Sequence, residues 1–89
     1  ESKVAFEREL SIIAVRSLSG DVRCYPLTEN VHANGVLALS LAPARVTAAL
    51  QKQAETIAVR VADALEYVGA FAIEFFDVGG QLVANEMAP

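Results

Sequence analysis

One long stretch with helical periodicity divides this chain into two parts. In residues 44–67, apolar side chains recur at intervals of three and four residues, and the charged side chains fall mainly between them. This spacing predicts an amphipathic helix with an apolar stripe along one side. Pro43 precedes the stretch and Gly69 follows it, at positions typical of a helix start and of a C-terminal cap. Whatever the rest of the chain forms, we expect one helix to cover it.

The sequence on both sides of this helix alternates between apolar and polar residues, which is the two-residue period of a strand. The strand-like stretches are residues 4–16, 22–27, 36–42, 70–76 and 81–86. Residues 28–35 are polar and end in Asn-Gly, a strong hairpin signal. We therefore expect an α+β fold, in which a mainly antiparallel sheet of about five strands is covered by one long helix. The whole of residues 1–89 is expected to form a single domain.

Size and apolar content suggest that this domain is part of something larger. The chain has 89 residues, of which 54% are hydrophobic, whereas globular domains usually have about 45–50%. A chain this short hides apolar surface poorly. It also lacks an initiator Met, and strand-like sequence reaches almost to both ends. We expect a partial domain.

Charge and cysteine content exclude several classes of protein. The net charge is −4 and the basic residues are scattered, which argues against a nucleic-acid-binding surface. No apolar run approaches the roughly 20 residues of a membrane span, and no leader pattern precedes the chain. Cys24 is the only cysteine, so we expect neither an intrachain disulfide nor a thiolate metal cluster, and a reducing, cytoplasmic setting.

The last two strand-like stretches each carry a glutamate, Glu74 and Glu86, among mostly apolar residues. If the loop between them holds three or five residues, both glutamates lie on one face as diagonal neighbours, with Cβ atoms about 7–8 Å apart or less. Two like charges at this range repel, so a shared proton, a basic side chain or a divalent cation must offset them.

No basic residue lies within this hairpin, which favours a cation. Mg²⁺ is commonly held by one or two carboxylates, with water and substrate phosphates completing its shell. The commoner alternative is that both glutamates simply face solvent. The amide of Asn85 and the neighbouring aromatic residues favour the metal site.

Four segments resemble a known family: FERELSIIAVR, YPLTENVHANGVL, LEYVGAFAIEFF and LVANEMAP. Together they are similar to the C-terminal half of the ATP-grasp domain in the 5-(carboxyamino)imidazole ribonucleotide synthase family, the ATPase subunit of a purine-pathway carboxylase. The similarity covers essentially all of residues 4–89. The twelve-residue separation of the two glutamates matches the metal-binding pair of ATP-grasp enzymes in general.

The resemblance implies a role for five residues. Glu74 and Glu86 would bind Mg²⁺, or Mn²⁺ in its place, where the ion bridges the ATP phosphates, and Asn85 would stand beside Glu86 at the phosphate end. Glu9 matches the carboxylate that accepts hydrogen bonds from the ATP ribose, and His32 matches a nucleotide-contacting histidine. Without the resemblance, Glu9 and His32 are more simply solvent-exposed residues. No residue is assigned a catalytic role.

The resemblance also implies an activity for the full-length protein. Such a ligase uses ATP and bicarbonate to carboxylate the exocyclic amine of 5-aminoimidazole ribonucleotide, in de novo purine biosynthesis, and releases ADP and phosphate. The whole enzyme is expected to be a cytoplasmic homodimer. The glycine-rich loop and the lysines that complete the nucleotide site are missing from the sequence, so we expect the isolated 89-residue chain to be inactive.

Two alternatives remain open. One is an ATP-grasp ligase that acts on a different acceptor. The other is a small non-catalytic module that binds a partner through its hairpin edge and apolar helix face. Only the second would be indifferent to nucleotide and metal.

Overall fold

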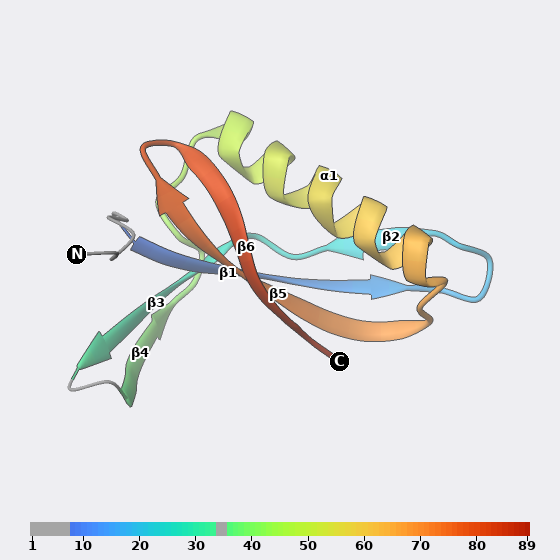
Figure 1. Cartoon of the computed structure of the whole chain (residues 1–89), viewed down its shortest axis with the longest axis horizontal. Helices are drawn as coiled ribbons and strands as arrows, with labels where there is room; N and C mark the ends of the chain where they lie inside the picture. The colour runs from blue at the N-terminus through green and yellow to red at the C-terminus, as the bar shows by residue number, and fades with distance from the viewer. Residues whose placement is uncertain (1–7, 34–35) are drawn as a thin grey trace.

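The computed structural model describes the backbone of residues 8–33 and 36–89, and the side chains of these residues except 32, 33 and 36–41. Within this part the chain forms six strands and one helix (Figure 1). In chain order they are β1 (Arg8–Arg16), β2 (Val22–Cys24), β3 (Thr28–Ala33), β4 (Val36–Leu41), α1 (Ala48–Leu65), β5 (Gly69–Val78) and β6 (Gln81–Ala88). The α+β class with a single long helix is confirmed.

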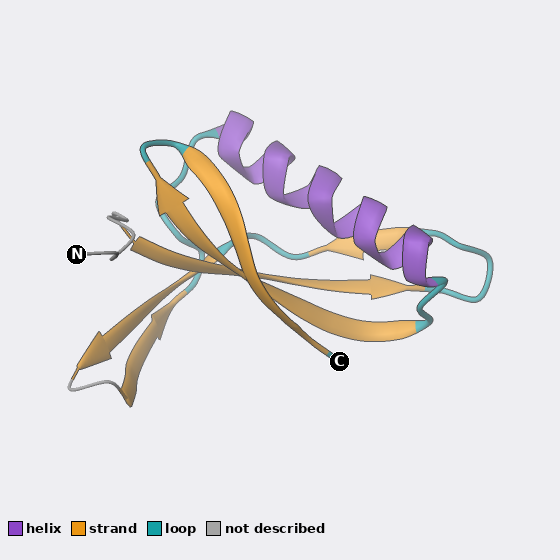
Figure 2. Ribbon diagram, in the orientation of Figure 1, coloured by secondary structure: helices purple, strands orange, loops and turns teal. Residues whose placement is uncertain are grey.

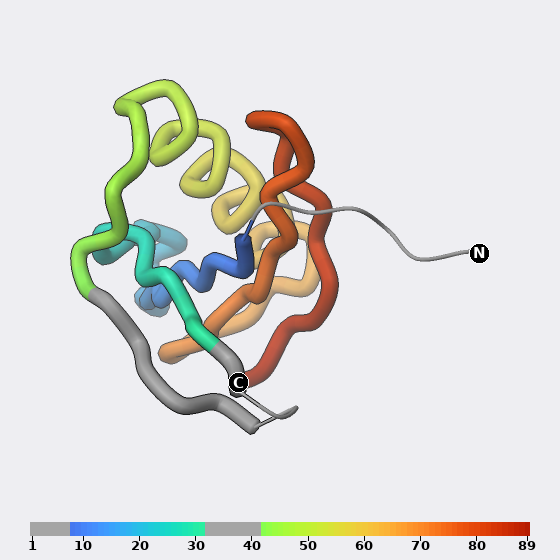
Figure 3. The backbone as a smooth tube through the Cα atoms, turned by 90° about the vertical axis from the view of Figure 1, so that its left-hand side faces the viewer, coloured from blue at the N-terminus to red at the C-terminus, as the bar shows by residue number. Residues whose placement is uncertain are grey.

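The described strands form one antiparallel sheet in the order β4-β3-β1-β5-β6. Strand β1 is central: it pairs with β5 along its whole length, and on its other side it pairs first with β3 and then with β2. Helix α1 runs along one face of the sheet (Figure 2). The view turned by 90° shows α1 on one side of β1 and the C-terminus on the other (Figure 3). One face of the sheet is therefore covered by the helix, and we call the opposite one the open face.

The core lies between α1 and the sheet, and it is built from the alternate residues of β1 and β5 that point toward the helix. Helix α1 contributes a stripe at four-residue spacing, largely of alanine, which lets the helix approach the strands closely. The buried apolar residues of these three elements are Leu10, Ile12, Ala14, Leu50, Ala54, Ala58, Ala62, Phe71, Ile73 and Phe75. Residues of the other parity on β1 and β5 therefore face away from the helix.

The sheet has six described strands, whereas about five were expected, because residues 28–33 form strand β3. Thr28, Glu29 and Asn30 pair with β1, so the omission of residues 28–33 from the strand-like stretches is wrong, whereas the antiparallel pairing of β3 with β4 confirms the hairpin signal. Strand β3 is polar partly because Thr28 and Asn30 belong to the open face, which α1 does not cover.

The helix is shorter than the sequence pattern suggested. Thr47 is its N-cap, and its Oγ1 accepts a hydrogen bond from the backbone nitrogen of Leu50 at 3.1 Å. Glu66, in the left-handed conformation with φ 50°, is the C-cap. Gly69 is therefore not the cap, and instead begins β5 with φ 124°. No helix in the described part of the chain combines the length and apolar character needed to cross a membrane.

Candidate functional site

The hairpin of β5 and β6 turns through two residues, Gly79 and Gly80, because Val78 pairs directly with Gln81. Both glycines have positive φ, 60° and 86°, as a tight two-residue hairpin turn requires. Asp77 supports the turn, since its Oδ1 accepts a hydrogen bond from the backbone nitrogen of Gly80 at 2.9 Å. The condition set for the two glutamates to share a face, a loop of three or five residues, is therefore not met.

A β-bulge nevertheless brings the two glutamates together. In an uninterrupted ladder from this turn, Glu74 would face Asn85, and Glu86 would lie opposite Ile73 on the helix-covered face. Instead the register shifts after Phe75, so that Glu74 pairs directly with Glu86 and Asn85 is the extra residue. The glutamates are thus directly opposed on the open face rather than diagonal, an arrangement in which Cβ atoms are about 4.5–5.5 Å apart.

Glu74 and Glu86 belong to one of two neighbouring rows of side chains that cross the open face from β3 through β1 and β5 to β6. The carboxylate row consists of Thr28, Ser11, Glu74 and Glu86. The Glu9 row consists of Asn30, Glu9, Phe76 and Val83. A hydrogen bond of 2.6 Å from Nδ2 of Asn30 to Oγ of Ser11 links the two rows. Glu9 is a diagonal neighbour of Glu74, about 7–8 Å away across one strand boundary.

The carboxylate pair is accessible to a ligand. Glu74 is half-buried, and Asn85 and Glu86 are exposed. Among the ion pairs of the described residues, neither glutamate is a partner. The same residues contain no cluster of three or more His, Cys, Asp or Glu side chains able to hold a metal by themselves. Two hard oxygen ligands on an open surface suit Mg²⁺, which keeps other positions for water and phosphate oxygens.

The two remaining predicted residues, Glu9 and His32, lie on different strands. Glu9 is half-buried on the open face, in the row next to Glu74, and is thus less exposed than its polar neighbours in sequence suggested. His32 lies in β3, with its backbone opposite Leu37 at a register shift. The side chain of His32 is outside the described part, so its role stays a prediction.

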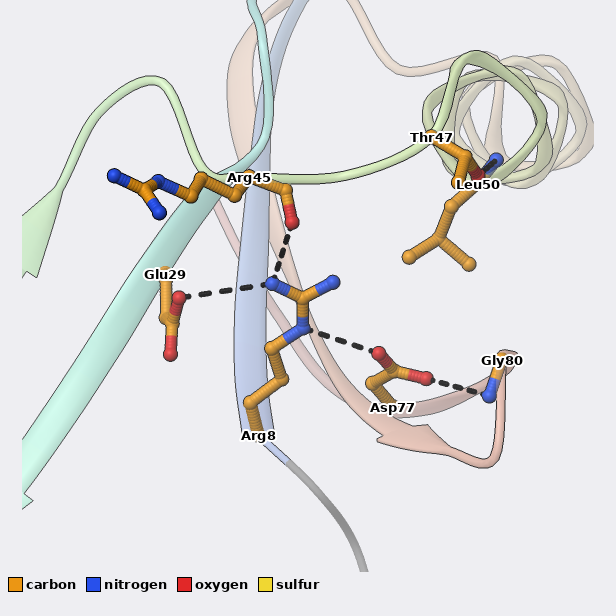
Figure 4. Close-up of polar contacts among 7 residues, drawn as sticks. All are labelled: Arg8, Glu29, Arg45, Thr47, Leu50, Asp77 and Gly80. Atoms are coloured by element: carbon orange, nitrogen blue, oxygen red, sulfur yellow. Dashed lines mark hydrogen bonds and ion pairs between the residues drawn. The ribbon is translucent and has the colours of Figure 1, made fainter.

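Sequence reasoning missed an ionic cluster on the helix-covered side of the sheet (Figure 4). Asp77 is 2% exposed and pairs with Arg8, whose Nε lies 3.1 Å from Oδ2 of Asp77. The same guanidinium donates to the carbonyl oxygen of Arg45 at 2.7 Å and lies 3.7 Å from Oε1 of Glu29. One signal was present in the sequence: Asp77 has the parity of the buried residues of β5, so it had to be ion-paired or hydrogen-bonded.

Beside Thr28, at the β3 end of the carboxylate row, the open face continues into an apolar groove of about 460 Å³. No charged side chain lines this groove, so it offers no further carboxylate ligand for a metal. Its lining residues are Ile13, Val15, Tyr25, Pro26, Thr28, Ala42, Pro43 and Ala70.

Cys24 is half-buried beside the core. Burial raises the pKa of its thiol above the ordinary value, and the nearby carboxylate of Glu55 raises it further. A thiol with a raised pKa is a poor nucleophile at neutral pH. Cys24 therefore fits the role of a small apolar residue that packs against the core.

Comparison with known proteins identifies the family that this chain resembles. The family model of the ATP-grasp domain matches residues 1–89. A relative from Vibrio cholerae, an N5-carboxyaminoimidazole ribonucleotide synthase, is 54% identical over 90 residues, which cover all of this chain and 23% of the relative.

Two solved structures are similar throughout. The crystal structure of N5-carboxyaminoimidazole ribonucleotide synthetase from Thermus thermophilus has a TM-score of 0.94 and 56% identity, over all of this chain and 25% of that one. The Aspergillus clavatus N5-carboxyaminoimidazole synthase, in complex with ADP and 5-aminoimidazole ribonucleotide, has a TM-score of 0.83 and 29% identity, over 99% of this chain and 24% of that one. The chain thus spans about a quarter of the length of the relatives it matches.

Proposed function

Because the chain belongs to the ATP-grasp family, we propose that it is the metal- and nucleotide-binding part of an ATP-dependent carboxylating ligase. The full-length protein would convert 5-aminoimidazole ribonucleotide, bicarbonate and ATP into 5-(carboxyamino)imidazole ribonucleotide, ADP and phosphate. The observation that carries this proposal is the direct pairing of Glu74 with Glu86 on the open face.

The spacing of the open-face carboxylates supports the assignment of roles. Glu74 and Glu86 would hold Mg²⁺, or Mn²⁺, with Asn85 at the phosphate end of the site. Glu9 would accept hydrogen bonds from the ribose hydroxyls, because an ionised carboxylate is a pure acceptor. Glu9 lies diagonally across from Glu74 on the same open face, so one nucleotide would contact both. His32 is proposed as a further nucleotide contact.

A bound divalent cation would offset the negative charge of the transferring phosphoryl group. The contribution of this chain would be to hold the ligands of the cation in place. Glu74 sits in the middle of a sheet, between β1 and β6, so its backbone has no freedom to move away. The bulge at Asn85 places Glu86, on the edge strand, directly opposite Glu74 on the same face. A rigid pair of acceptors needs little reorganisation when the nucleotide binds.

The identity of the substrates rests on the relatives. The Aspergillus clavatus protein binds ADP and 5-aminoimidazole ribonucleotide, and a relative more than 50% identical to this chain carries the name of the same synthase. We extend these substrates, with bicarbonate, to the full-length form of this protein. A cytoplasmic homodimer is part of the same proposal.

The proposal is tested by Glu86→Gln and Glu74→Gln in the full-length protein, with Glu66→Gln as the matched control. Glu66 is also an exposed glutamate, but it lies at the end of α1 on the other side of the sheet. We expect each site variant to lower imidazole-ribonucleotide-dependent ATP hydrolysis by about 10²–10³-fold, the usual effect of removing one electrostatic stabiliser of the transition state. Mn²⁺ binding to the ADP complex, followed by electron paramagnetic resonance, should weaken in parallel.

Near-normal turnover and Mn²⁺ binding in Glu86→Gln would refute the metal role. Loss of Mn²⁺ binding in Glu86→Gln, combined with turnover of the wild type on another acceptor, would instead favour a different ATP-grasp ligase. The isolated 89-residue chain should show no turnover and weak Mn²⁺ binding, since the phosphates that complete the shell would have to be held by other parts of the enzyme.

A further inference from the structure

Arg8 lies at the start of β1, on the helix-covered side of the sheet, and its guanidinium contacts three separate segments (Figure 4). It pairs with Asp77 at the end of β5 and with Glu29 on β3. It also donates to the carbonyl oxygen of Arg45, in the segment that leads to α1. One side chain therefore connects two strands that flank β1 with the approach to the helix.

Each charged residue of this cluster has a sequence neighbour in the Glu9 row on the opposite face. Arg8 precedes Glu9, and Glu29 precedes Asn30. Asp77 follows Phe76, and Glu74 lies two residues before Phe76 on the same face. A slip of one residue between these strands would move every side chain to the other face. The contacts of Arg8 therefore help to fix the positions of Glu9 and Glu74 relative to each other.

The chemistry of the cluster needs a guanidinium. The side chain of Asp77 is 3% exposed, whereas those of Arg8 and Glu29 are 24% and 28% exposed. The carboxylate of Asp77 is shared, because one oxygen accepts from Arg8 and the other from the turn at Gly80. A planar fork with several fixed donors can serve Asp77, Glu29 and a carbonyl at once, and a lysine ammonium on a flexible stem cannot hold the same three in register.

We propose that Arg8 is a positioning residue: through Asp77 and Glu29, it holds β3, β1 and β5 in the register that sets Glu9 at its working distance from the Glu74–Glu86 pair. This proposal rests on the proposed function, in which Glu9 binds the ribose of the nucleotide and the Glu74–Glu86 pair binds the metal at its phosphates. Arg8 itself acts from the face opposite to the nucleotide.

The test is Arg8→Lys in the full-length enzyme, with Arg16→Lys as the matched control. Arg16 ends the same strand and also makes one ion pair and one carbonyl contact, to Asp63 and Tyr67. Those contacts lead to the end of α1 and not to the hairpin. We expect Arg8→Lys to raise the KM for ATP about tenfold, since small misplacements of binding groups have effects of this size, and Arg16→Lys to leave it within about twofold.

The split between KM and kcat separates positioning from simple loss of structure. A purely structural defect leaves fewer active molecules, which lowers the apparent kcat at an unchanged KM for ATP, and that result would overturn the proposal. If Arg8→Lys yields no folded protein by circular dichroism, Glu29→Gln decides the question, because it removes a single arm of the cluster. A KM raised about threefold supports positioning, and an unchanged KM contradicts it.

Glu86→Gln is measured alongside to keep the two proposals apart. If Glu86→Gln retains turnover, the proposed function itself is refuted. If Glu86→Gln loses turnover and Arg8→Lys has an unaltered KM for ATP, only the proposed role of Arg8 is refuted.

Discussion

Replacing Glu86 with glutamine should stabilise the metal-free protein while it removes a proposed metal ligand. Glu74 and Glu86 are directly opposed on neighbouring strands, and neither is a partner in the ion pairs of the described residues. Without a cation, their charges repel each other in the folded state and are farther apart in the unfolded chain. Removing one charge should therefore raise the free energy of unfolding.

The size of this effect follows from the geometry. Carboxylates about 6 Å apart in a largely aqueous surrounding repel by about 0.7 kcal/mol. Like charges directly opposed in a sheet destabilise by a similar amount, about 0.2–1 kcal/mol. For a domain of this size, such a change raises the Tm by about 3–5 °C.

The assay is thermal unfolding followed by circular dichroism, without metal, at low ionic strength and again at about 1 M NaCl, where the Debye length is about 3 Å. The Tm of Glu86→Gln should exceed that of the wild type at low salt, and the gap should close at high salt.

Addition of Mg²⁺ and ADP to the full-length protein should then make the Tm of the wild type higher than that of Glu86→Gln. Ligand that binds only the folded state stabilises it, so the wild type should gain more than the variant does. A variant that is no more stable than the wild type at low salt would refute the reasoning, as would a gain that persists unchanged in about 1 M salt. Either result would mean that the two charges are not close neighbours in the metal-free protein.

Two further predictions concern the packing that supports the site. Phe75→Ala should lower the free energy of unfolding by about 3–5 kcal/mol in urea titration, because Phe75 is fully buried. Val83→Ala, which trims a residue that is 45% exposed, should cost less than about 1 kcal/mol; equal losses would contradict the assigned faces. Burial and Glu55 raise the pKa of Cys24 when folded, so the folded state retains a proton that the unfolded state releases. Stability should therefore fall as the pH rises past the ordinary thiol pKa, and in Cys24→Ala that fall should disappear.

Much of the framework could be predicted from the pattern of apolar residues. Alternation defined β1 and β5, and the three- and four-residue spacing defined the helix. Both patterns report which side chains must leave water, and burial is what decides the layers of a fold of this kind.

Strand β3 escaped prediction because its polar residues carry no burial signal. Thr28 and Asn30 sit on the open face and gain their place from pairing with β1. Backbone pairing of that kind depends on a partner remote in sequence, so no local pattern reveals it. The buried pair of Arg8 and Asp77 was missed for the same reason, since 69 residues separate its members.

The sequence by itself determined which residues could form the site: two glutamates twelve residues apart, a third carboxylate near the start, and a mostly apolar frame to carry them. Only the tertiary structure decided that they meet. In a hairpin, facing follows the parity of residue number, and a two-residue turn alone would have sent Glu86 to the helix-covered face. The single extra residue at Asn85 reverses that parity, and this choice depends on the pairing of whole strands, which no short stretch of sequence contains.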